Sequence, residues 1–598
     1  MMISSLKTSV QRVPARARWI FLFGLLALAG LIVLHFAFIY NFSNAHPRSD
    51  QWRHITKIII PWSSGDVSPK ILWSNHHPNP LLHFYQIFIA GPIFDWDVRK
   101  DAYFSLTLHI LIYLSLAVVT LRLAKDKMSP FLLFGIFATG AYFLLFQTTL
   151  TWVWTLVSLQ SLGYVFGIAM LIALSRFGML NQATSLTKET RVSLILGLIT
   201  IITVLMNFDY GVIFFLSAFG AMTLVSIFHR DKALFLQMII YAGISVVGIL
   251  LIKLLLLPSG KEGEGASVIA LITGLPDLVK AYFYSISSAF WGESWFRDFT
   301  IHGSGVFLPA ISIAFTTFVF LGAALAALSK GRRGLLMLGL MIYSALFSLA
   351  VFTARDAGDF TILLSSSRYA TNFKLSWVGA FLALALYAAE AVKFMPRQRW
   401  MGLTCGVFMV ALISGAVATN MSWDKAKNLR AAYDRDEMMV YILGTDPSAN
   451  FRLPSSVVGS NRNFDASLNF LVENEYSVFN PKFRPGPQLA IYRDLKMQIE
   501  GNPANSYKIV MDSRAVPAKK SDRVDLCIEL TNLPTDGPVI LEIDHLNDKR
   551  IYNGRLRLRA KDYKRVLSAL PGQTRHYVQP GVDKMKVCSW SELRLVEN

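Results

Sequence analysis

Asp50 is the residue of this chain whose position best suits acid–base chemistry. It lies about nine residues beyond the first long hydrophobic segment, within Ser49-Asp50-Gln51-Trp52-Arg53. A carboxylate held near a substrate hydroxyl can take its proton, which is the task of a general base. A solvated acid or a helix cap explains the same residue without any function. General-base chemistry at Asp50 is therefore a hypothesis that depends on the elements around it.

His76 and His77 follow Asp50 in the same polar stretch. Imidazole nitrogens can hydrogen-bond a phosphate, and with Asp50 they can hold a divalent cation such as Mg²⁺ or Mn²⁺. A turn before Pro78 accounts for either histidine taken singly. Asp66 is a second acid of the stretch, and its position after Ser-Ser-Gly favours a turn. These residues leave open whether a metal takes part.

Other polar side chains stand where long hydrophobic segments end. Arg368 precedes one such segment, and a guanidinium there can bind a phosphate through two parallel hydrogen bonds. Lys374 can serve in the same way, whereas anchoring at a membrane interface explains both cations. Asp209 lies between two hydrophobic segments at their predicted outer junction. A hairpin between two helices would explain this position without a function. Three more candidates for substrate contact are Tyr369, Trp152 and Glu293; Trp154 and Gln160 lie near Trp152, and Arg297, Asp298 and His302 lie near Glu293.

The composition shows that this chain belongs in a membrane. Its 598 residues are 53% hydrophobic and only 16% charged, and the mean hydropathy is +0.43. Ordinary soluble domains do not show such values. About eleven apolar stretches approach the roughly twenty residues that a helix needs to cross a bilayer. They cover residues 19–41, 103–123, 129–147, 157–175, 191–207, 210–228, 234–257, 306–328, 335–353, 373–392 and 401–419.

The basic residues predict how these segments are oriented. Arg12, Arg16 and Arg18 precede the first segment and place the N-terminus in the cytoplasm. At about 22 residues, that segment is too long for the hydrophobic core of a signal peptide, so it is predicted to be an uncleaved anchor. Alternation then places five short basic loops inside, which accounts for much of the net charge of +19 without nucleic acid. These loops carry Arg122, Lys125 and Lys127; Arg176, Lys188 and Arg191; Arg230 and Lys232; Lys330, Arg332 and Arg333; and Lys393, Arg397 and Arg399.

An odd number of segments places the remaining loops and the C-terminus outside, in a bacterial periplasm. The outer loops are predicted at 42–102, 258–305 and 354–372, with a short amphipathic or partly embedded helix over 81–90. The chain thus divides into a transmembrane module, residues 1–420, and a soluble domain, residues 421–598. That domain is predicted to be a helical hinge over 424–443 followed by a mostly β region, with strands near 507–512, 524–530, 539–543, 555–558 and 586–590.

The cysteines add one constraint on the soluble domain. Cys405 falls within the last hydrophobic segment, whereas Cys527 and Cys588 fall in two different predicted strands. An oxidising compartment permits a disulfide between the latter two. The pair is too poor in nearby ligands to suggest zinc.

A transferase acting on the outer face needs an activated donor that is carried by a lipid, because nucleotide sugars stay in the cytoplasm. A sugar on a polyprenyl phosphate or pyrophosphate meets this need. The reaction requires a carboxylate for the acceptor hydroxyl, cations for the leaving phosphate, and aromatic side chains for the sugar and lipid. The candidate residues supply all three kinds of group.

The order of these features resembles the GT-C glycosyltransferases, integral membrane enzymes with polyprenyl-linked donors. The similarity covers residues 1 to about 420, and within the superfamily it is to a largely uncharacterised bacterial subgroup. It implies that Asp50 is the catalytic base. Where similar proteins show a His-Asn-Glu-His-Arg type run, this chain has His76-His77-Pro78-Asn79-Pro80, which lacks the acid and the arginine. The similarity rests on the runs Asp50-Gln51-Trp52, Leu72-Trp73-Ser74-Asn75-His76-His77, 152–160 and Ser367-Arg368-Tyr369-Ala370-Thr371.

The prediction is a hexosyl- or pentosyltransferase of the bacterial inner membrane that moves a sugar from a polyprenyl-phosphate donor to a cell-envelope glycan or lipid-linked glycan. Membrane lipids are the other expected partners. Two alternatives stay open. An O-antigen polymerase or ligase also uses lipid-linked sugars, but usually lacks a large outer C-terminal domain. A flippase or other transporter predicts ionisable groups near mid-membrane, whereas Lys253 and Glu390 lie close to segment ends.

Overall fold

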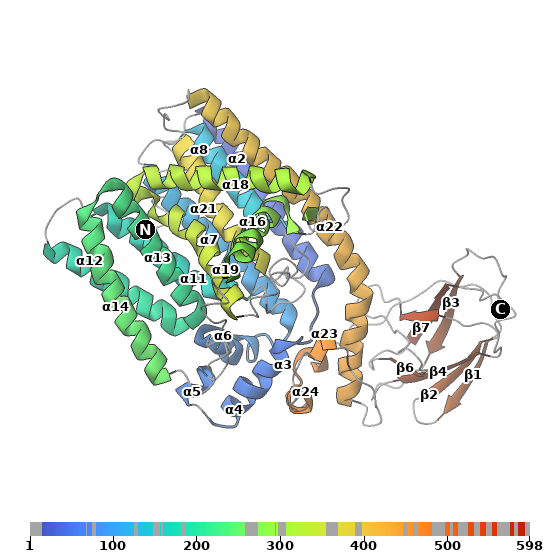
Figure 1. Ribbon diagram of the computed structural model, residues 1–598. Helices are drawn as coiled ribbons and strands as arrows, with labels where there is room; N and C mark the ends of the chain where they lie inside the picture. Colours follow the sequence, from blue (N-terminus) through green and yellow to red (C-terminus); the bar gives the residue numbers. More distant parts are fainter. Residues whose placement is uncertain are drawn as a thin grey trace. The chain divides into compact units, whose positions relative to one another are not determined.

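The structure is a computed structural model of the chain (Figure 1). It describes residues 15–66, 68–73, 79–124, 129–146, 156, 159–180, 186–256, 273–293, 295–296, 307–354, 369–388, 397–445, 453, 455–458 and 464–480, and seven strands between residues 497 and 592. The chain forms two compact units. The bundle unit comprises Met1–Tyr40, Val67–Phe84 and Asp101–Lys425, and the loop unit comprises Asn41–Asp66, Tyr85–Lys100 and Ala426–Asn598.

Each apolar stretch that the sequence singles out is a helix. Seven described helices are long and apolar enough to cross a membrane, and α8, α11 and α12 are among the shorter apolar ones. The chain is therefore an α-helical membrane protein. The eleven helices are α2 (Ala15–Phe42), α7 (Val98–Leu123), α8 (Pro130–Leu144), α11 (Ser161–Leu180), α12 (Leu186–Met206), α13 (Phe208–His229), α14 (Lys232–Leu256), α18 (Phe307–Ser329), α19 (Leu335–Ala354), α21 (Ala370–Ala388) and α22 (Arg397–Thr445).

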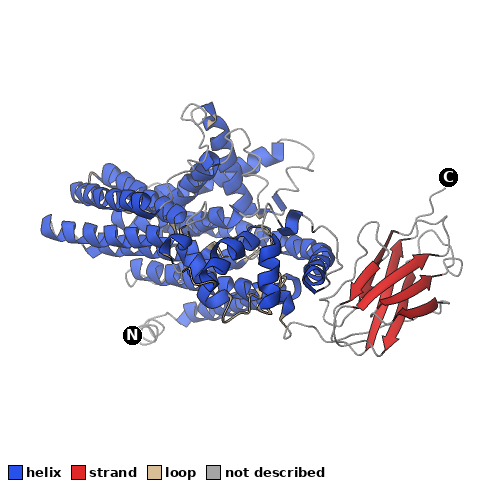
Figure 2. Ribbon diagram, turned by 90° about the horizontal axis from the view of Figure 1, so that it is seen from below, coloured by secondary structure: helices blue, strands red, loops and turns tan. Residues whose placement is uncertain are grey.

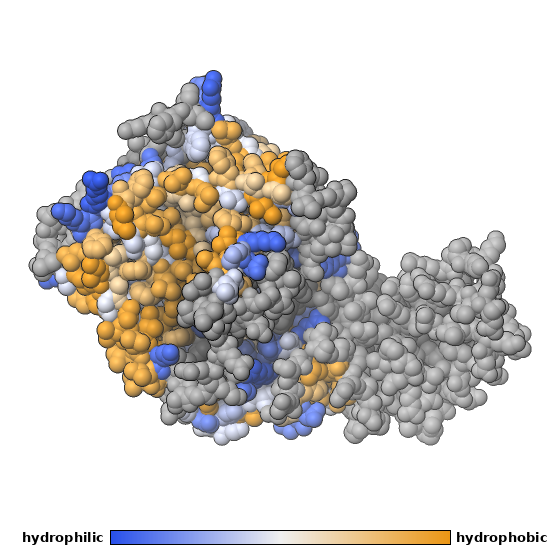
Figure 3. Space-filling view, viewed as in Figure 1, coloured by the Kyte–Doolittle hydropathy of each residue, from blue (hydrophilic) through white to orange (hydrophobic). Residues whose placement is uncertain are grey.

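The outer surface of these helices is apolar. Leu254 and Leu255 on α14 are 78% and 72% exposed, and Phe318 on α18 is 78% exposed. Figure 3 shows hydrophobic residues over large parts of the described surface. A surface of this kind suits lipid and would be a liability in water.

Small residues let the helices of the bundle unit approach one another closely. A Cβ atom at Gly135 of α8 would stand 2.5 Å from the Cβ of Ala385 on α21. One at Gly379 of α21 would stand 2.9 Å from the Met337 carbonyl oxygen on α19. Close approach at small residues is the usual way in which membrane helices associate, because lipid provides no hydrophobic force between them. It places α21 in the centre, with Trp377 and Phe381 fully buried.

Two loops that the sequence assigns to the cytoplasmic side meet at one end of the bundle unit. Arg332, in the turn η3 (Gly331–Gly334), donates two hydrogen bonds to the Asp231 carboxylate, at 2.7 and 2.9 Å. These bonds lower the pKa of the Asp231 carboxyl. The ring of His229 also bonds the Leu328 carbonyl oxygen at 2.7 Å. Both loops therefore lie at the same end of the bundle, as alternation requires.

A helix within residues 258–305 differs from the predicted outer loop. Residues Leu275–Trp291 form α16, whose side chains pack against α18, α19 and α21. The indole of Trp377 donates to the Ile286 carbonyl oxygen at 2.8 Å, and the Tyr142 hydroxyl donates to that of Ala289 at 2.6 Å. The stretch that the sequence assigns to an outer loop therefore contains a helix with a buried apolar face, which is too short to be recognised as a span, and its location on the outer side stays a prediction.

The loop unit joins two parts of the first predicted outer loop to the chain from Ala426 onward, which includes the C-terminal part of α22. Its other helical elements are α3 (Asp50–His54), the π-helix η1 (Ile55–Ile59), α4 (Ile60–Ser63), the π-helix η2 (Gln86–Ala90), α23 (Ser455–Val458), α24 (Phe464–Glu473) and η5 (Ser477–Phe479). The π-helix η2 continues α6 (Pro80–Tyr85), so a helix exists where the sequence predicts one over 81–90. The short helix α5 spans Pro69–Leu72.

Trp52 is the centre of the packing between these segments. Its side chain is fully buried and meets the ring of Phe464 edge-on at 4.7 Å. Its carbonyl oxygen accepts hydrogen bonds from Ser467 Oγ at 2.9 Å and Thr56 Oγ1 at 3.0 Å. Residues about 400 positions apart thus form one core, so the division at residue 420 does not describe the compact units.

The hinge and the β region follow the sequence more closely. Helix α22 continues over 49 residues, roughly 70 Å at 1.5 Å per residue, so the last span and the predicted hinge are one helix. Figure 2 shows strands only in the C-terminal part of the described chain. The strands are β1 (Met497–Asn502), β2 (Ser506–Met511), β3 (Val524–Thr531), β4 (Val539–His545), β5 (Asn553–Leu558), β6 (Arg575–Val578) and β7 (Lys584–Glu592).

The strands form two sheets with the orders β1-β2-β4-β6 and β3-β7-β5. Strands β2 and β4 are parallel, and the other pairs are antiparallel. Five of the strands coincide with the predicted stretches. The sequence does not predict β1 or β6. In β1, Gly501 interrupts the alternating pattern, and β6 is too short to show one.

The register of β3 and β7 generates a prediction about the cysteines. Cys527 and Cys588 are direct partners in this antiparallel ladder. Partners of this kind have Cα atoms about 4.5–5.5 Å apart, within the range of disulfides. We expect non-reducing peptide mapping of protein from an oxidising compartment to recover the two cysteines in one cross-linked peptide. Free thiols at both positions under these conditions would contradict the pairing, and Cys405 provides the thiol control.

Candidate functional site

Asn372 is the hub of a polar cluster inside the bundle unit. It lies in the first turn of α21 and is fully buried. Its Oδ1 accepts hydrogen bonds from the hydroxyls of Tyr164 on α11 and Tyr343 on α19, at 3.0 and 2.7 Å. Its Nδ2 donates to Gln160 Oε1 at 3.4 Å. One amide therefore ties together three helices and the residue that precedes α11.

Asp209 and Tyr210 lie beside this hub, in the first turn of α13. Asn207 caps the helix by accepting from the Tyr210 amide at 3.1 Å, and an acid in the first turn is favoured by the helix dipole. The ring of Tyr210 meets that of Tyr164 edge-on at 5.5 Å. Asp209 and Tyr210 are half-buried. Helix α12 ends at Met206 and α13 begins at Phe208, so Asp209 lies directly after the short connection between them and next to Tyr210.

Tyr369, the residue before α21, is the last member of the cluster. Its ring contacts Phe347 at 5.5 Å, and Phe347 in turn contacts Tyr343 and Tyr210. Tyr369 also packs against Leu278 of α16. Three residues that the sequence singles out are thus linked to this cluster: Gln160 through Asn372, Tyr369 through Phe347, and Asp209 as the residue before Tyr210. We call Gln160, Tyr164, Asp209, Tyr210, Tyr343, Tyr369 and Asn372 the tyrosine cluster.

Acidic, amide and phenol groups of this kind suit a carbohydrate. Sugar hydroxyls need both donors and acceptors, and aromatic faces pack against the C–H faces of the rings. The half-buried members of the cluster, Gln160, Asp209, Tyr210 and Tyr369, are the ones a ligand can reach. Helices α11, α13 and α21 contribute residues from the ends that the sequence assigns to the outer side, whereas Tyr343 lies near the middle of α19.

Lys374 has a structural role that the sequence does not indicate. Its side chain is buried, its Nζ donates to the Leu145 carbonyl oxygen at the C-terminus of α8, and it lies over the rings of Tyr142 and Phe143, at 5.6 and 5.9 Å. A cation at a helix C-terminus is stabilised by the helix dipole. Interfacial anchoring is therefore wrong for Lys374. His35 stacks on Phe146 at 4.2 Å, and this buried histidine belongs to the same neighbourhood.

Glu293 lies within the bundle unit and not in an exposed loop. It follows Gly292, whose φ of 93° ends α16, and its side chain is only 4% exposed. A Cβ atom at Gly292 would stand 2.2 Å from the Cβ of Ala418, so glycine is required here by conformation and space. The predicted substrate-contacting loop thus begins with a buried carboxylate.

Asp50 begins a helical rod in the loop unit. Helices α3, η1 and α4 follow one another over residues 50–63, and the Asp50 side chain is exposed at the N-terminus. Its neighbours Gln51 and Trp52 are buried. The Asp50 carboxylate is thus accessible to solvent, while the buried side chains of Gln51 and Trp52 fix the backbone next to it.

The residue before Asp50 has an unusual backbone conformation. Ser49 adopts φ 50° and ψ −118°, which is the second position of a type II′ turn and favours glycine. The turn is closed by the Gln51 amide, which donates to the Arg48 carbonyl oxygen at 3.1 Å. The Ser49 amide donates to the Val457 carbonyl oxygen at 2.6 Å, which holds the turn. Such strain costs about 1–3 kcal/mol and is found preferentially at functional sites.

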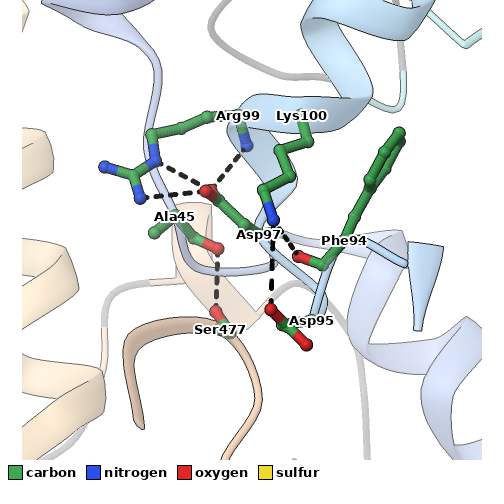
Figure 4. A network of polar contacts seen from close by, with 7 residues as sticks. All are labelled: Ala45, Phe94, Asp95, Asp97, Arg99, Lys100 and Ser477. Atoms are coloured by element: carbon green, nitrogen blue, oxygen red, sulfur yellow. Dashed lines mark hydrogen bonds and ion pairs between the residues drawn. The ribbon is translucent and has the colours of Figure 1, made fainter. Parts of the chain in front are cut away.

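Backbone strain is concentrated in the loop unit. Among the described residues, six non-glycine residues have positive φ, and five of them belong to this unit: Ser49, Asp95, Trp96, Glu475 and Ser477. The Ser477 amide donates to the Asp95 carbonyl oxygen at 2.7 Å, which joins two of these turns. Ser477 Oγ also donates to the Ala45 carbonyl oxygen at 2.7 Å, as Figure 4 shows.

The charged residues of Figure 4 pair with one another. Arg99 donates to both oxygens of Asp97, at 2.7 and 2.9 Å, and Lys100 donates to the Phe94 carbonyl oxygen at 3.2 Å. Asp97 is buried. The network therefore stabilises the start of α7. The carboxylate of Asp97 is already bonded to Arg99.

His54 joins the rod to the second π-helix. Its Nδ1 lies 3.1 Å from Gln86 Oε1, and both side chains are buried. His54 immediately precedes η1, and Gln86 begins η2. Single π-helical turns inside α-helices occur frequently at functional sites. Burial lowers the pKa of His54 to about 4, against which the hydrogen bond with Gln86 acts, so the ring is neutral at pH 7.

Several predicted site residues lie outside the described residues: His76, His77, Trp152, Trp154, Arg368, Arg297, Asp298 and His302. The metal hypothesis for Asp50 with His76 therefore stays a prediction. Among the described residues, no group of three or more histidine, cysteine, aspartate or glutamate side chains could hold a metal ion.

Sequence reasoning missed Asn372 and Ser49, and it also missed three tyrosines of the cluster, Tyr164, Tyr210 and Tyr343. A sequence signal exists for Asn372, because an amide in the first turn of an apolar helix is costly in lipid unless it is bonded. No such signal exists for Ser49, since its φ is set by a turn and by a partner more than 400 residues away. Comparison of the chain with protein-family models, curated proteins and solved structures gives no match.

Replacing Asn372 by leucine should destabilise the bundle unit. The Tyr164 and Tyr343 hydroxyls would lose their acceptor in a buried place, which we expect to cost about 1–2 kcal/mol. Thermal unfolding in detergent micelles, followed by tryptophan fluorescence, measures the effect. Ser376→Ala on the same helix is the control, because Ser376 donates only to the Leu340 carbonyl oxygen. Equal melting temperatures for the two variants would contradict the role of the hub.

His54 should make the loop unit less stable in mild acid. Its pKa rises from about 4 in the folded state to 6.5 in the unfolded state. The unfolded state therefore gains a proton first, and stability that is complete above pH 6.5 is lost as the pH falls toward 4. At pH 5 the loss is about 2 kcal/mol. Unfolding curves at pH 7 and pH 5 measure it; His54→Gln, which does not titrate, should show a smaller difference, and an equal one would contradict the assignment.

Proposed function

We propose that the protein is a GT-C-type glycosyltransferase that transfers a sugar from a polyprenyl-phosphate donor to a cell-envelope glycan on the periplasmic side. Asp50 is the general base that deprotonates the acceptor hydroxyl. The attack displaces the phosphate directly and inverts the anomeric centre. Eleven membrane-spanning helices and a periplasmic C-terminal domain belong to the same proposal, which has its origin in the ordered sequence motifs.

The observation that carries this proposal is the setting of Asp50. An exposed carboxylate at the start of a helical rod follows directly on a residue in a strained turn. Ordinary solvated acids need no such support, because nothing depends on their position. A general base must be held where it meets one proton, and positional precision of this kind is worth several kcal/mol in catalysis.

The tyrosine cluster supports the transferase from the bundle unit. Its half-buried acid, amide and phenols match the groups needed to hold a sugar ring, and they lie at helix ends that the sequence assigns to the outer side. In this proposal Asp209 and Tyr369 contact the donor sugar, and Arg368 with His76 or His77 contacts the phosphate. Each assignment stands on the residues of its own unit.

A transporter of lipid-linked glycans is the second candidate, because Lys374, His35 and His109 are buried within the bundle unit. Ionisable side chains inside membrane helices often mark transport pathways. Lys374, however, bonds the C-terminus of α8, and His109 Nδ1 bonds the Ser105 carbonyl oxygen of its own helix at 2.8 Å. Local partners of this kind favour a structural role. The polymerase or ligase alternative also uses a lipid-linked donor and differs in its acceptor.

Asp50→Asn should abolish most of the transfer. Purified protein in detergent is given radiolabelled polyprenyl-phosphate hexoses and pentoses, with a membrane glycan and lipid extract as acceptor. Loss of the base is expected to lower the rate about 10²–10⁴-fold. Asp66→Asn is the matched control, since Asp66 is an exposed acid of the same unit.

A folded Asp50→Asn protein that transfers sugar at the wild-type rate would show that the base assignment is wrong. If the wild-type protein moves lipid-linked glycan across vesicles but forms no glycosidic bond with any donor, the transporter is correct instead. A product that contains a polymer or a lipid A-linked glycan would favour the polymerase or ligase.

A further inference from the structure

A groove between α16 and α18 lies on the apolar surface of the bundle unit. Its volume is about 580 Å³. Apart from one cation and one threonine, its lining is apolar or aromatic. The residues are Lys280, Phe283 and Tyr284 on α16 and Ile313, Ala314, Thr317, Phe318 and Leu321 on α18.

The groove opens on the part of the surface that faces lipid. Phe318 and Leu321 are 78% and 51% exposed, and α18 is one of the helices long and apolar enough to cross a membrane. In Figure 3, viewed as in Figure 1, the surface over α18 is predominantly hydrophobic. A hydrocarbon chain is therefore the natural occupant.

Helix α16 separates this groove from the tyrosine cluster. Leu278 and Ala281 face Tyr369 and Phe352, and the Tyr282 hydroxyl lies 3.3 Å from Ser344 Oγ on α19. Lys280, Phe283 and Tyr284 line the groove instead. The groove is therefore a site distinct from the tyrosine cluster.

Charge and size select the occupant. Lys280 is exposed and is the one charged residue of the lining, so it favours an anionic headgroup. At about 30 Å³ for each water-sized group, 580 Å³ holds roughly twenty methylene-sized groups, the length of one fatty acyl chain. A polyprenyl chain is much longer. We propose that the groove binds one acyl chain of an anionic bilayer phospholipid, with the lipid phosphate on Lys280.

Native mass spectrometry of the full-length protein tests this site, with phosphatidylglycerol and phosphatidylcholine as probes. The wild type should retain one phosphatidylglycerol through detergent exchange and hold phosphatidylcholine at least fivefold more weakly. Lys280→Gln should remove that preference. Lys253→Gln, an exposed lysine of α14 outside the groove, should keep it.

A second pair of variants tests the groove itself. Ala314→Trp fills the groove from an exposed position and should remove the retained lipid, whereas Ala310→Trp, exposed on the same helix outside the lining, should not. Retention of phosphatidylglycerol by Ala314→Trp at the wild-type level overturns the proposal. So does equal retention of both lipids by the wild type, or the recovery of a polyprenyl phosphate as the species that Ala314→Trp displaces. The outcome does not depend on whether the protein transfers sugar.

Discussion

The requirement that every backbone amide and carbonyl in a bilayer be bonded within the protein governs most of this structure. Lipid offers no partner for these groups, so each apolar stretch must be a helix. Lipid also provides no hydrophobic force between helices, so they are held by close contact and by polar bonds. Gly135 and Gly379 permit the contact, and Asn372, Lys374 and Trp377 supply bonds around the central helix α21. The polar residues of the bundle unit thus hold the helices together before they serve any ligand.

The loop unit follows a different rule because it has an ordinary core. Trp52 is buried against Phe464, and Ser467 and Thr56 bond the carbonyl oxygen of the tryptophan. The contacts of this core fix the surrounding backbone. They hold Ser49 at a positive φ, which a serine in an unconstrained chain rarely adopts. The same packing leaves Asp50 exposed at the start of the rod. The strained backbone of Ser49 and the exposed carboxylate of Asp50 are adjacent, which distinguishes Asp50 from an ordinary acid in a surface loop.

Much of the fold could be predicted from sequence. Hydropathy located eleven helices, and alternation located five strands within one or two residues. The burial of individual polar side chains could not be predicted from the sequence. Lys374 was expected near an interface and Glu293 in a substrate-contacting loop, yet both are inside the bundle unit. The helix α16 was read as part of a loop, because its apolar face alternates with polar residues and is too short for a span. Hydropathy averages over a segment, whereas burial depends on which face of a helix meets its neighbours.

The sequence by itself determined which segments are apolar helices and where acids, cations and aromatic residues stand at their ends, because these properties are local and periodic. It also selected Gln160, Asp209 and Tyr369 singly. Only the tertiary structure decided that these three belong to one cluster with Asn372 at its centre, that the first loop packs with residues 455–480, and that Ser49 is strained beside Asp50. The reason is physical: these features arise from contacts between residues hundreds of positions apart, and neither composition nor period contains the rotation of one helix against another.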